Sequence, residues 1–264
     1  MTRLSRWFAA HPDRKALITF VTAGDPAPAC TVPAMHAQVA GGADILELGI
    51  PFSDPEAEGP AIQASSERAL ANGVRLKDVL QMVRDFRATN SETPVVLMGY
   101  LNSILAMPDF AEAAQEAGVD GLIMVNLPPE EAGQMQKDLA AKDIDLIFLL
   151  APTTTAQRAQ QILEQASGFV YYVSLKGITG ASHLDPDAVR NKVEPLRAQT
   201  SLPVCVGFGI KDATSAAAVA PHADGVVVGS ALVNLMSQHT DPQACANALQ
   251  AAVGALRAGI DGAS

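Results

Sequence analysis

The chain has 264 residues, of which 48% are hydrophobic, and a formal net charge of −10 at pH 7. This acidic balance argues against nucleic acid or an anionic membrane surface as a partner, and no apolar stretch approaches the ~20 residues of a membrane span. Three scattered cysteines without a CxxC pair, and a start without an apolar signal segment, predict a reduced, cytoplasmic protein.

Eight short apolar runs alternate with stretches of helical spacing along the chain. The predicted strands are residues 16–21, 45–50, 95–100, 121–127, 145–151, 169–175, 204–209 and 225–229. Helical spacing of apolar residues is clear in 112–117, 131–139 and 157–166. Eight β/α units in a chain of this length are typical of a (β/α)₈ TIM barrel of the α/β class. No linker-like segment divides the chain, so we expect 1–264 to form a single TIM-barrel domain.

A short motif recurs before three of the predicted strands. Residues 42–44, 118–120 and 222–224 each end in an apolar residue followed by Asp. Such a sequence favours a compact turn from a helix into a strand.

The second predicted strand contains a carboxylate, Glu47. Side chains alternate between the two faces of a strand, and Leu46, Leu48 and Ile50 form an entirely apolar face that must pack on helices. Glu47 is therefore expected to point into the barrel, near the C-terminal strand ends where barrel active sites are built. Burial there raises the pKa of a carboxyl group. A structural Glu paired with Lys or Arg is the alternative, and we favour catalysis over it.

The loop that follows, residues 51–60, holds three candidates for a second carboxylate over the barrel mouth: Asp54, Glu56 and Glu58. Its prolines restrict the loop and reduce the entropy lost on ordering. Two carboxylates in different environments can divide the roles of acid and base. From spacing alone, a solvated surface charge is the favoured interpretation of each candidate.

Glycines end the seventh and eighth predicted strands. Gly209 closes one, and Gly229 and Ser230 close the other, directly before a predicted helix at 231–236. Barrels often bind phosphate with these two loops and the N-terminus of a short helix, where backbone N–H groups favour an anion. We therefore expect a phosphate site here, with simple tight turns as the alternative.

The sixth loop, residues 176–183, contains Thr179 between two glycines and has the composition of a mobile lid or of an ordinary surface loop. Tyr100 and Tyr172 lie at predicted strands, where core packing is the first expectation and ligand contact the second. The histidines show no metal-ligand spacing, so no metal site is predicted.

Residues 46–55 and 59–63 resemble the signature of the tryptophan synthase alpha chain family. Similar matches extend over residues 20–26, 148–154, 168–179, 207–210 and 224–233. The resemblance implies cleavage of indole-3-glycerol phosphate to indole and glyceraldehyde 3-phosphate, with no cofactor in this chain. It also implies a tryptophan synthase β chain partner in an α₂β₂ complex, which carries pyridoxal phosphate and receives the indole through a tunnel.

The resemblance also implies residue roles. Glu47 is expected to act as acid and base at the scissile carbon–carbon bond, and Glu58 to accept the indole N–H. The expected substrate-binding residues are Phe20, Leu127, Tyr172 and Phe208 around the indole, Gly180, Gly209, Gly229 and Ser230 around the phosphate, and in addition Tyr100 and Thr179.

Two positions depart from the family pattern: Glu58 stands where Asp is usual, and Asn126 where Asp is frequent. A displacement of about 1 Å in a reacting group can cost about 10²-fold in rate. Two alternatives to an active lyase therefore stay open. One is a weakly catalytic regulatory subunit that mainly activates the β chain. The other is a different phosphate-handling barrel, such as an aldolase or sugar isomerase, which is disfavoured because only Lys176 approaches a Schiff-base position.

Overall fold

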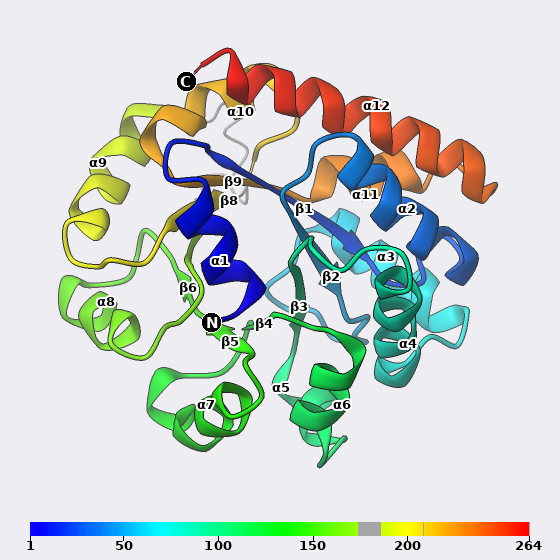
Figure 1. Ribbon diagram of the computed structural model, residues 1–264, viewed down its shortest axis with the longest axis horizontal. Coiled ribbons are helices and arrows are strands. Elements are labelled where there is room, and N and C mark those ends of the chain that lie inside the picture. The colour runs from blue at the N-terminus through cyan, green and yellow to red at the C-terminus, as the bar shows by residue number, and fades with distance from the viewer. Residues whose placement is uncertain (174–185, 208, 264) are drawn as a thin grey trace.

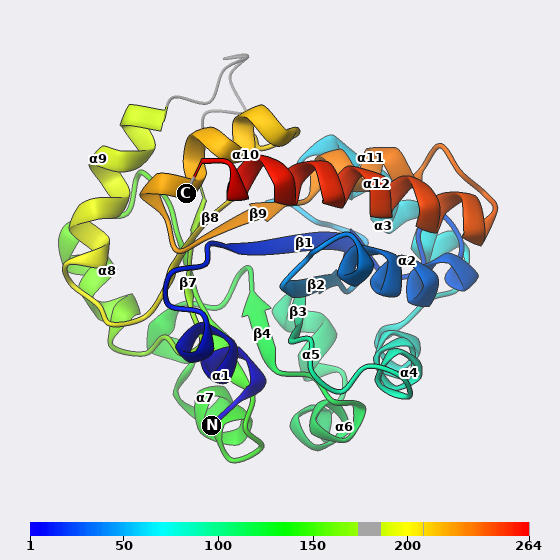
Figure 2. The ribbon, with the colours of Figure 1, turned by 45° about the horizontal axis from the view of Figure 1, so that its top comes forward.

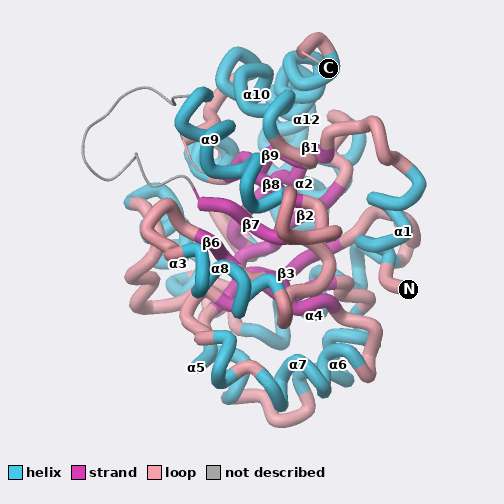
Figure 3. Tube along the Cα trace, turned by 90° about the vertical axis from the view of Figure 1, so that its left-hand side faces the viewer, coloured by secondary structure: helices cyan, strands magenta, loops and turns pink. Residues whose placement is uncertain are grey.

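The computed structural model describes residues 1–173, 186–207 and 209–263. Its strands form one parallel sheet that curls into a barrel, with the helices outside it (Figures 1 and 3). The order of the nine assigned strands is β5-β4-β3-β2-β1-β9-β8-β7-β6. They are β1 (Ala16–Thr22), β2 (Ile45–Gly49), β3 (Val95–Gly99), β4 (Gly121–Met124), β5 (Asp145–Ile147), β6 (Leu149–Leu150), β7 (Val170–Val173), β8 (Val204–Gly207) and β9 (Gly225–Val228).

The two edges of this sheet, β5 and β6, come from one predicted run and are interrupted only at Phe148. β5 pairs with β4, β6 pairs with β7, and the Tyr171 N–H donates to the Phe148 carbonyl at 3.1 Å. Consecutive residues thus join the two edges and close the barrel. The nine assigned strands correspond to the eight predicted ones, which confirms the TIM barrel.

Most of the helices cover the outside of the barrel, and the first one lies across its end (Figure 1). The helices are α1 (Arg3–Ala10), α2 (Pro28–Ala40), α3 (Pro60–Ala71), α4 (Leu76–Arg87), α5 (Leu101–Leu105), α6 (Phe110–Ala117), α7 (Gly133–Ala140), α8 (Ala156–Leu163), α9 (Pro186–Arg197), α10 (Ala213–Val219), α11 (Ser230–Met236) and α12 (Pro242–Asp261), with short 3-10 turns at Pro129–Glu131 and Ala220–His222. The long α12 packs along α2, α10 and α11 (Figure 2).

Two separate apolar clusters show which way the strand side chains point. Ile18, Ile45 and Ile123 belong to a lumen cluster that α1 closes with Leu4. Leu46 and Leu48 belong instead to the larger cluster between the sheet and the helices. The faces predicted for β2 are therefore confirmed, and Glu47, which alternates with Leu46 and Leu48, lies on the lumen side.

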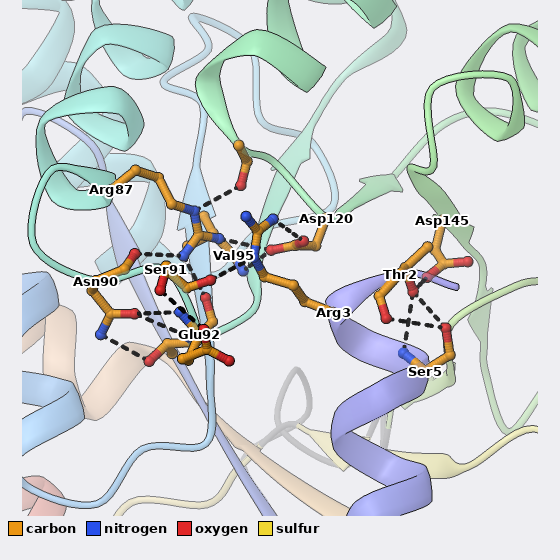
Figure 4. Close-up of polar contacts among 12 residues, drawn as sticks. Thr2, Arg3, Ser5, Arg87, Asn90, Ser91, Glu92, Val95, Asp120 and Asp145 are labelled. Carbon is orange, nitrogen blue, oxygen red and sulfur yellow. Dashed lines mark hydrogen bonds and ion pairs between the residues drawn. The ribbon is translucent and has the colours of Figure 1, made fainter.

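The repeated Asp motif holds the N-terminal ends of the strands. The carboxylates of Asp44, Asp120 and Asp224 accept the backbone N–H groups of Leu17, Val95 and Val204 at 2.8, 2.8 and 2.9 Å. Each carboxylate is also paired with at least one arginine, as Figure 4 shows for Asp120 with Arg3 and Arg87. This end of the barrel is thus built for stability, and the opposite end is left for chemistry.

Candidate active site

Glu47 lies on β2 beside Phe20 of β1 in the parallel register and is only 2% exposed. Its Oε2 atom has no hydrogen-bond partner, and no Lys or Arg pairs with it in the part of the chain that the structure describes. Burial raises the pKa of Glu47 to about 8, and the nearby Glu58 carboxyl contributes to the rise. The described residues therefore give no support to a structural ion pair, and they leave a carboxyl group that can exchange a proton near neutral pH.

Glu58 is the acidic residue of the following loop that reaches the site. It lines a pocket at the C-terminal end of β1, β2 and β3, and burial raises its pKa to about 7. Its backbone is held because its N–H donates to Pro55 and its carbonyl accepts from Gln63 Nε2 at 2.8 Å. Asp54 and Glu56 are exposed, and neither lines this pocket. The fold therefore selects Glu58 from the three candidates of the sequence.

The pocket lies between β1, β2, β3, the loop after β2 and the first turns of α3. Its lining residues are Phe20, Thr22, Gly49, Ile50, Phe52, Pro55, Glu58, Ile62, Ser66, Met98, Gly99 and Tyr100. Apolar and aromatic side chains predominate, and Glu58 supplies the one carboxyl group among them. This lining has the composition of a small-molecule site, and the space that it encloses in this conformation is about the size of a water molecule.

Tyr100 supports the loop as well as the pocket wall. Its hydroxyl accepts the Ala57 N–H at 3.1 Å, and its ring stacks on Phe52 with centroids 4.8 Å apart. Burial raises the pKa of Tyr100 to about 12, so it stays neutral. Tyr100 thereby fixes the loop segment directly before Glu58.

Two glycines make room for the ring of Phe20. A Cβ on Gly49 would lie 2.6 Å from Phe20 Cζ, and one on Gly229 would lie 3.3 Å from Phe20 Cδ1. Strands β2 and β9 flank β1, so Phe20 is held between glycines of both neighbours. The position of this aromatic side chain therefore depends on residues that carry no side chain of their own.

The predicted phosphate residues lie at the ends of two neighbouring strands. Gly229 is the N-cap of α11 and follows β9, Ser230 is exposed at the first position of that helix, and Gly209 follows β8 with a φ of +78°. Thr179, Gly180 and Phe208 lie outside the described residues, so their expected roles stay predictions.

Leu127 and Tyr172 are not brought to this pocket, because both are buried in the larger cluster between the sheet and the helices. The neighbouring Tyr171 lies instead on the lumen face, and burial, Glu47 and Glu58 all raise its pKa. Its hydroxyl occupies the space that a side chain at Gly207 would need, 2.4 Å from the position of such a Cβ. Sequence reasoning missed Tyr171, because both faces of its predicted strand are apolar and alternation does not distinguish it from Tyr172.

Asn126 has a local structural task at the edge of the site. Its Oδ1 accepts the Leu101 N–H at 2.8 Å, at the first residue of α5. An amide oxygen satisfies this helix N-terminus as a carboxylate oxygen would. The departure from Asp at this position therefore keeps the capping hydrogen bond.

Two further findings concern metal sites and membrane-spanning helices in the described ranges 1–173, 186–207 and 209–263. Within them, no three His, Cys, Asp or Glu side chains are grouped to hold a metal ion. Within the same ranges, no helix combines the length and the apolarity that crossing a membrane requires.

A TIM barrel with two buried carboxyl groups of raised pKa toward its C-terminal end has the architecture of the barrel enzymes. A family model described as tryptophan synthase alpha chain matches residues 8–261. Curated alpha chains from Alkalilimnicola ehrlichii and Burkholderia ambifaria are each 54% identical, covering 99% and 100% of this chain and 97% and 98% of the relatives.

Solved structures agree with this match. A tryptophan synthase subunit alpha from Legionella pneumophila is 45% identical, with a TM-score of 0.91 and 99% of each chain covered. A chain of M. tuberculosis tryptophan synthase in an aminoacrylate-bound form is 36% identical, with a TM-score of 0.87 over 98% of this chain and 100% of that one. The chain belongs to the tryptophan synthase alpha chain family. It is a carbon–carbon lyase of tryptophan biosynthesis, which cleaves indole-3-glycerol phosphate to indole and glyceraldehyde 3-phosphate.

Proposed function

We propose that Glu47 is the general acid and base of this cleavage and that Glu58 accepts the indole N–H. The observation that carries the proposal is the buried Glu47 carboxyl, whose Oε2 lacks a hydrogen-bond partner among the described residues. A group in that state gives and takes a proton without first breaking an interaction with the protein.

The proposed reaction is a retro-aldol cleavage. Glu47 donates a proton to indole C3 and becomes a carboxylate. The Glu47 carboxylate then removes the proton from the hydroxyl on the adjacent glycerol carbon. As the bond between these two carbons breaks, its electron pair returns to the ring and restores indole, and the hydroxyl carbon becomes the aldehyde. Protonation at C3 makes N1–H more acidic, so an anionic Glu58 stabilises the charge that develops there.

For substrate binding, we propose that Phe20, Tyr100 and Tyr171 surround the indole. Gly209, Gly229 and Ser230 hold the phosphate, together with Gly180. The short helix α11 supports the phosphate role, because its N-terminal N–H groups favour an anion in a chain of negative net charge. Thr179 and Phe208 remain candidates for substrate binding, and their support is the family resemblance of the sequence.

We further propose that the chain works in the cytoplasm with a tryptophan synthase β chain in an α₂β₂ complex. Three free, buried cysteines are consistent with a reducing compartment. The β partnership follows from family membership.

A regulatory subunit with weak catalysis of its own is the second candidate, because Glu58 is one methylene longer than the usual Asp. Steady-state cleavage of indole-3-glycerol phosphate by the isolated chain and by the chain saturated with β tests both. The lyase proposal expects measurable, Glu47-dependent cleavage in both conditions. Cleavage that is absent alone and unaffected by Glu47→Gln in the complex supports the regulatory candidate.

A further inference from the structure

Helix α3 is tied to the loop after β1 by an ion pair beside the active site. Asp25 in that loop is 1% exposed, whereas the side chain of Arg68 on α3 is 38% exposed. Arg68 Nε donates to Asp25 Oδ1 at 2.6 Å and Arg68 Nη2 donates to Oδ2 at 3.1 Å. Such two-point contacts fix the relative orientation of the two groups as well as their distance.

Two further contacts join the same segments. The hydroxyls of Thr22 and Ser65, both buried, are 2.6 Å apart, and Asn72 Nδ2 donates to the carbonyls of Gly24 and Pro26. We call Thr22, Asp25, Ser65, Arg68 and Asn72 the β1–α3 clasp. Its contacts run from Ser65 to Asn72, the C-cap of α3, and join this half of the helix to the end of β1 and the loop after it.

The clasp joins the two walls of the pocket. On one side, Phe20 and Thr22 belong to β1; on the other, Ile62 and Ser66 belong to α3. Glu58 is coupled to the same helix, because Gly59 is the N-cap of α3 and Pro60 its first residue. The position of the Glu58 carboxyl relative to Phe20 therefore depends on how α3 sits on β1, in addition to the contacts of the loop with Tyr100 and Pro55.

The distance along α3 from Arg68 to the start of the helix is long enough for a small tilt to displace Glu58. Eight residues separate Arg68 from Pro60, the first residue of α3, which is about 12 Å at a rise of about 1.5 Å per helical residue. A tilt of about 5° at the clasp thus moves the start of α3 by about 1 Å, and such a misplacement can cost about 10²-fold in rate.

We propose that Arg68, through Asp25, is a positioning residue for the lyase reaction: it holds α3 at the angle that places Glu58 over the indole site. The inference rests on the proposed role of Glu58 and deepens it. Arg68 itself lines no part of the pocket.

The chain offers a matched control at the opposite end of the barrel. Arg197 pairs with Asp224 through the same two nitrogens, Nε at 3.2 Å and Nη2 at 2.7 Å, and its side chain is 41% exposed. Arg68→Met and Arg197→Met therefore remove arginines of similar exposure from two-point ion pairs, and only the first borders the active site. The carboxylates differ, because Asp25 is 1% exposed and Asp224 is 25% exposed.

The experiment measures kcat and KM for indole-3-glycerol phosphate from pH 5.5 to 9, with thermal unfolding of each variant. We expect Arg68→Met to lower kcat at least about tenfold with KM within about threefold, and to shift the acid limb of the pH profile. Arg68→Lys, which retains one contact, should recover part of kcat. Arg197→Met should lower Tm by less than Arg68→Met, because Asp224 stays partly exposed to water, and should leave kcat within about twofold.

Equal losses of kcat in Arg68→Met and Arg197→Met would overturn the positioning role, as would a wild-type kcat and acid limb in Arg68→Met. If Arg68→Met does not fold, Arg68→Lys carries the test, and an unchanged kcat and pH profile there overturns the proposal. Glu47→Gln and Glu58→Ala are measured in parallel. If these two retain wild-type turnover, the proposed function itself has failed, which separates that failure from a failure of the clasp.

Discussion

The carboxyl group of Glu58, on the loop after β2, raises the pKa of Glu47 on the strand itself. Burial is the larger cause of the rise in the pKa of Glu47, which reaches about 8. Burial also raises the pKa of Glu58, to about 7. Because the two groups interact, their protons leave in steps that belong to the pair. A coupled pair of this kind can hold one proton in the neutral range, which is what one acid and one anionic acceptor require.

This pairing predicts a bell-shaped pH dependence of kcat/KM. Glu58 must be anionic to accept the indole N–H, so activity should fall as the pH drops below about 7. Glu47 must be protonated to act on C3, so activity should also fall above about 8. Initial rates at low substrate from pH 5.5 to 9.5 report the free enzyme. A flat profile over this range contradicts the pairing.

The free energy of unfolding should depend on pH through the Glu47 carboxyl group. Between pH 4.5, the ordinary pKa of the carboxyl, and about 8, the native state keeps a proton on Glu47 that the unfolded chain has lost. The native state then binds more protons, so the free energy of unfolding falls as the pH rises. The Glu47→Gln variant lacks this pH-dependent loss. Urea unfolding should therefore show its free energy of unfolding rising relative to that of wild type by on the order of 2 kcal/mol between pH 5.5 and 8.5. Parallel curves for the two proteins argue against a raised pKa.

Glu58→Ala should lower turnover by about 10²-fold or more with a smaller effect on phosphate affinity, because the group acts at the indole nitrogen and not at the phosphate. Glu58→Asp tests whether the loop is adapted to the longer side chain and should be much less damaging. Steady-state kinetics together with inhibition by glycerol phosphate separates the two effects. Intact turnover in Glu58→Ala means that another group accepts the N–H.

Gly49→Ala tests whether the position of the Phe20 ring matters for activity. The added Cβ would lie 2.6 Å from Phe20 Cζ, so the ring must move and the indole slot must change shape. We expect kcat/KM to fall by about tenfold or more. Gly133→Ala is the control, because a Cβ there meets nothing within 4 Å. Equal kinetics in both variants would show that the ring position is not critical.

Asp54 is the residue we expect to affect coupling to the β chain more than chemistry. It is exposed on the loop that carries Glu58, and its carboxylate accepts a hydrogen bond from Ser53 at 2.6 Å. A partner that orders this loop should stimulate cleavage by about 5- to 150-fold, the usual range of such coupling. Asp54→Asn should reduce the stimulation and keep basal turnover. Glyceraldehyde 3-phosphate release with and without saturating β measures both; no stimulation of wild type, or no complex by sedimentation, favours a stand-alone enzyme.

The barrel was predictable because strands covered on both faces must be apolar throughout, and all eight runs became strands of it. The lumen position of Glu47 was predictable for a related reason, since one face of its strand is purely apolar. The same reasoning fails for Tyr171 and Tyr172, because both faces of that strand are equally apolar and adjacent tyrosines cannot be told apart. The break at Phe148 left no signal in the fifth run.

The second carboxylate and its support could not be derived from spacing. Asp54, Glu56 and Glu58 are equivalent in the sequence, and only the path of the loop brings Glu58 to the pocket. Asp25 and Arg68 lie 43 residues apart, as do Thr22 and Ser65. Such contacts depend on the angle at which a helix packs on a strand, and this angle cannot be derived from one sequence.

The most direct test of the account is turnover of indole-3-glycerol phosphate by Glu47→Gln at pH 7.5. Gln is nearly isosteric and cannot exchange the proton, so the account predicts a native circular-dichroism spectrum, wild-type affinity for glycerol phosphate and a loss of turnover of at least about 10²-fold. Turnover within a few-fold of wild type in a folded Glu47→Gln protein would contradict the central claim that this buried carboxyl group is the acid and base.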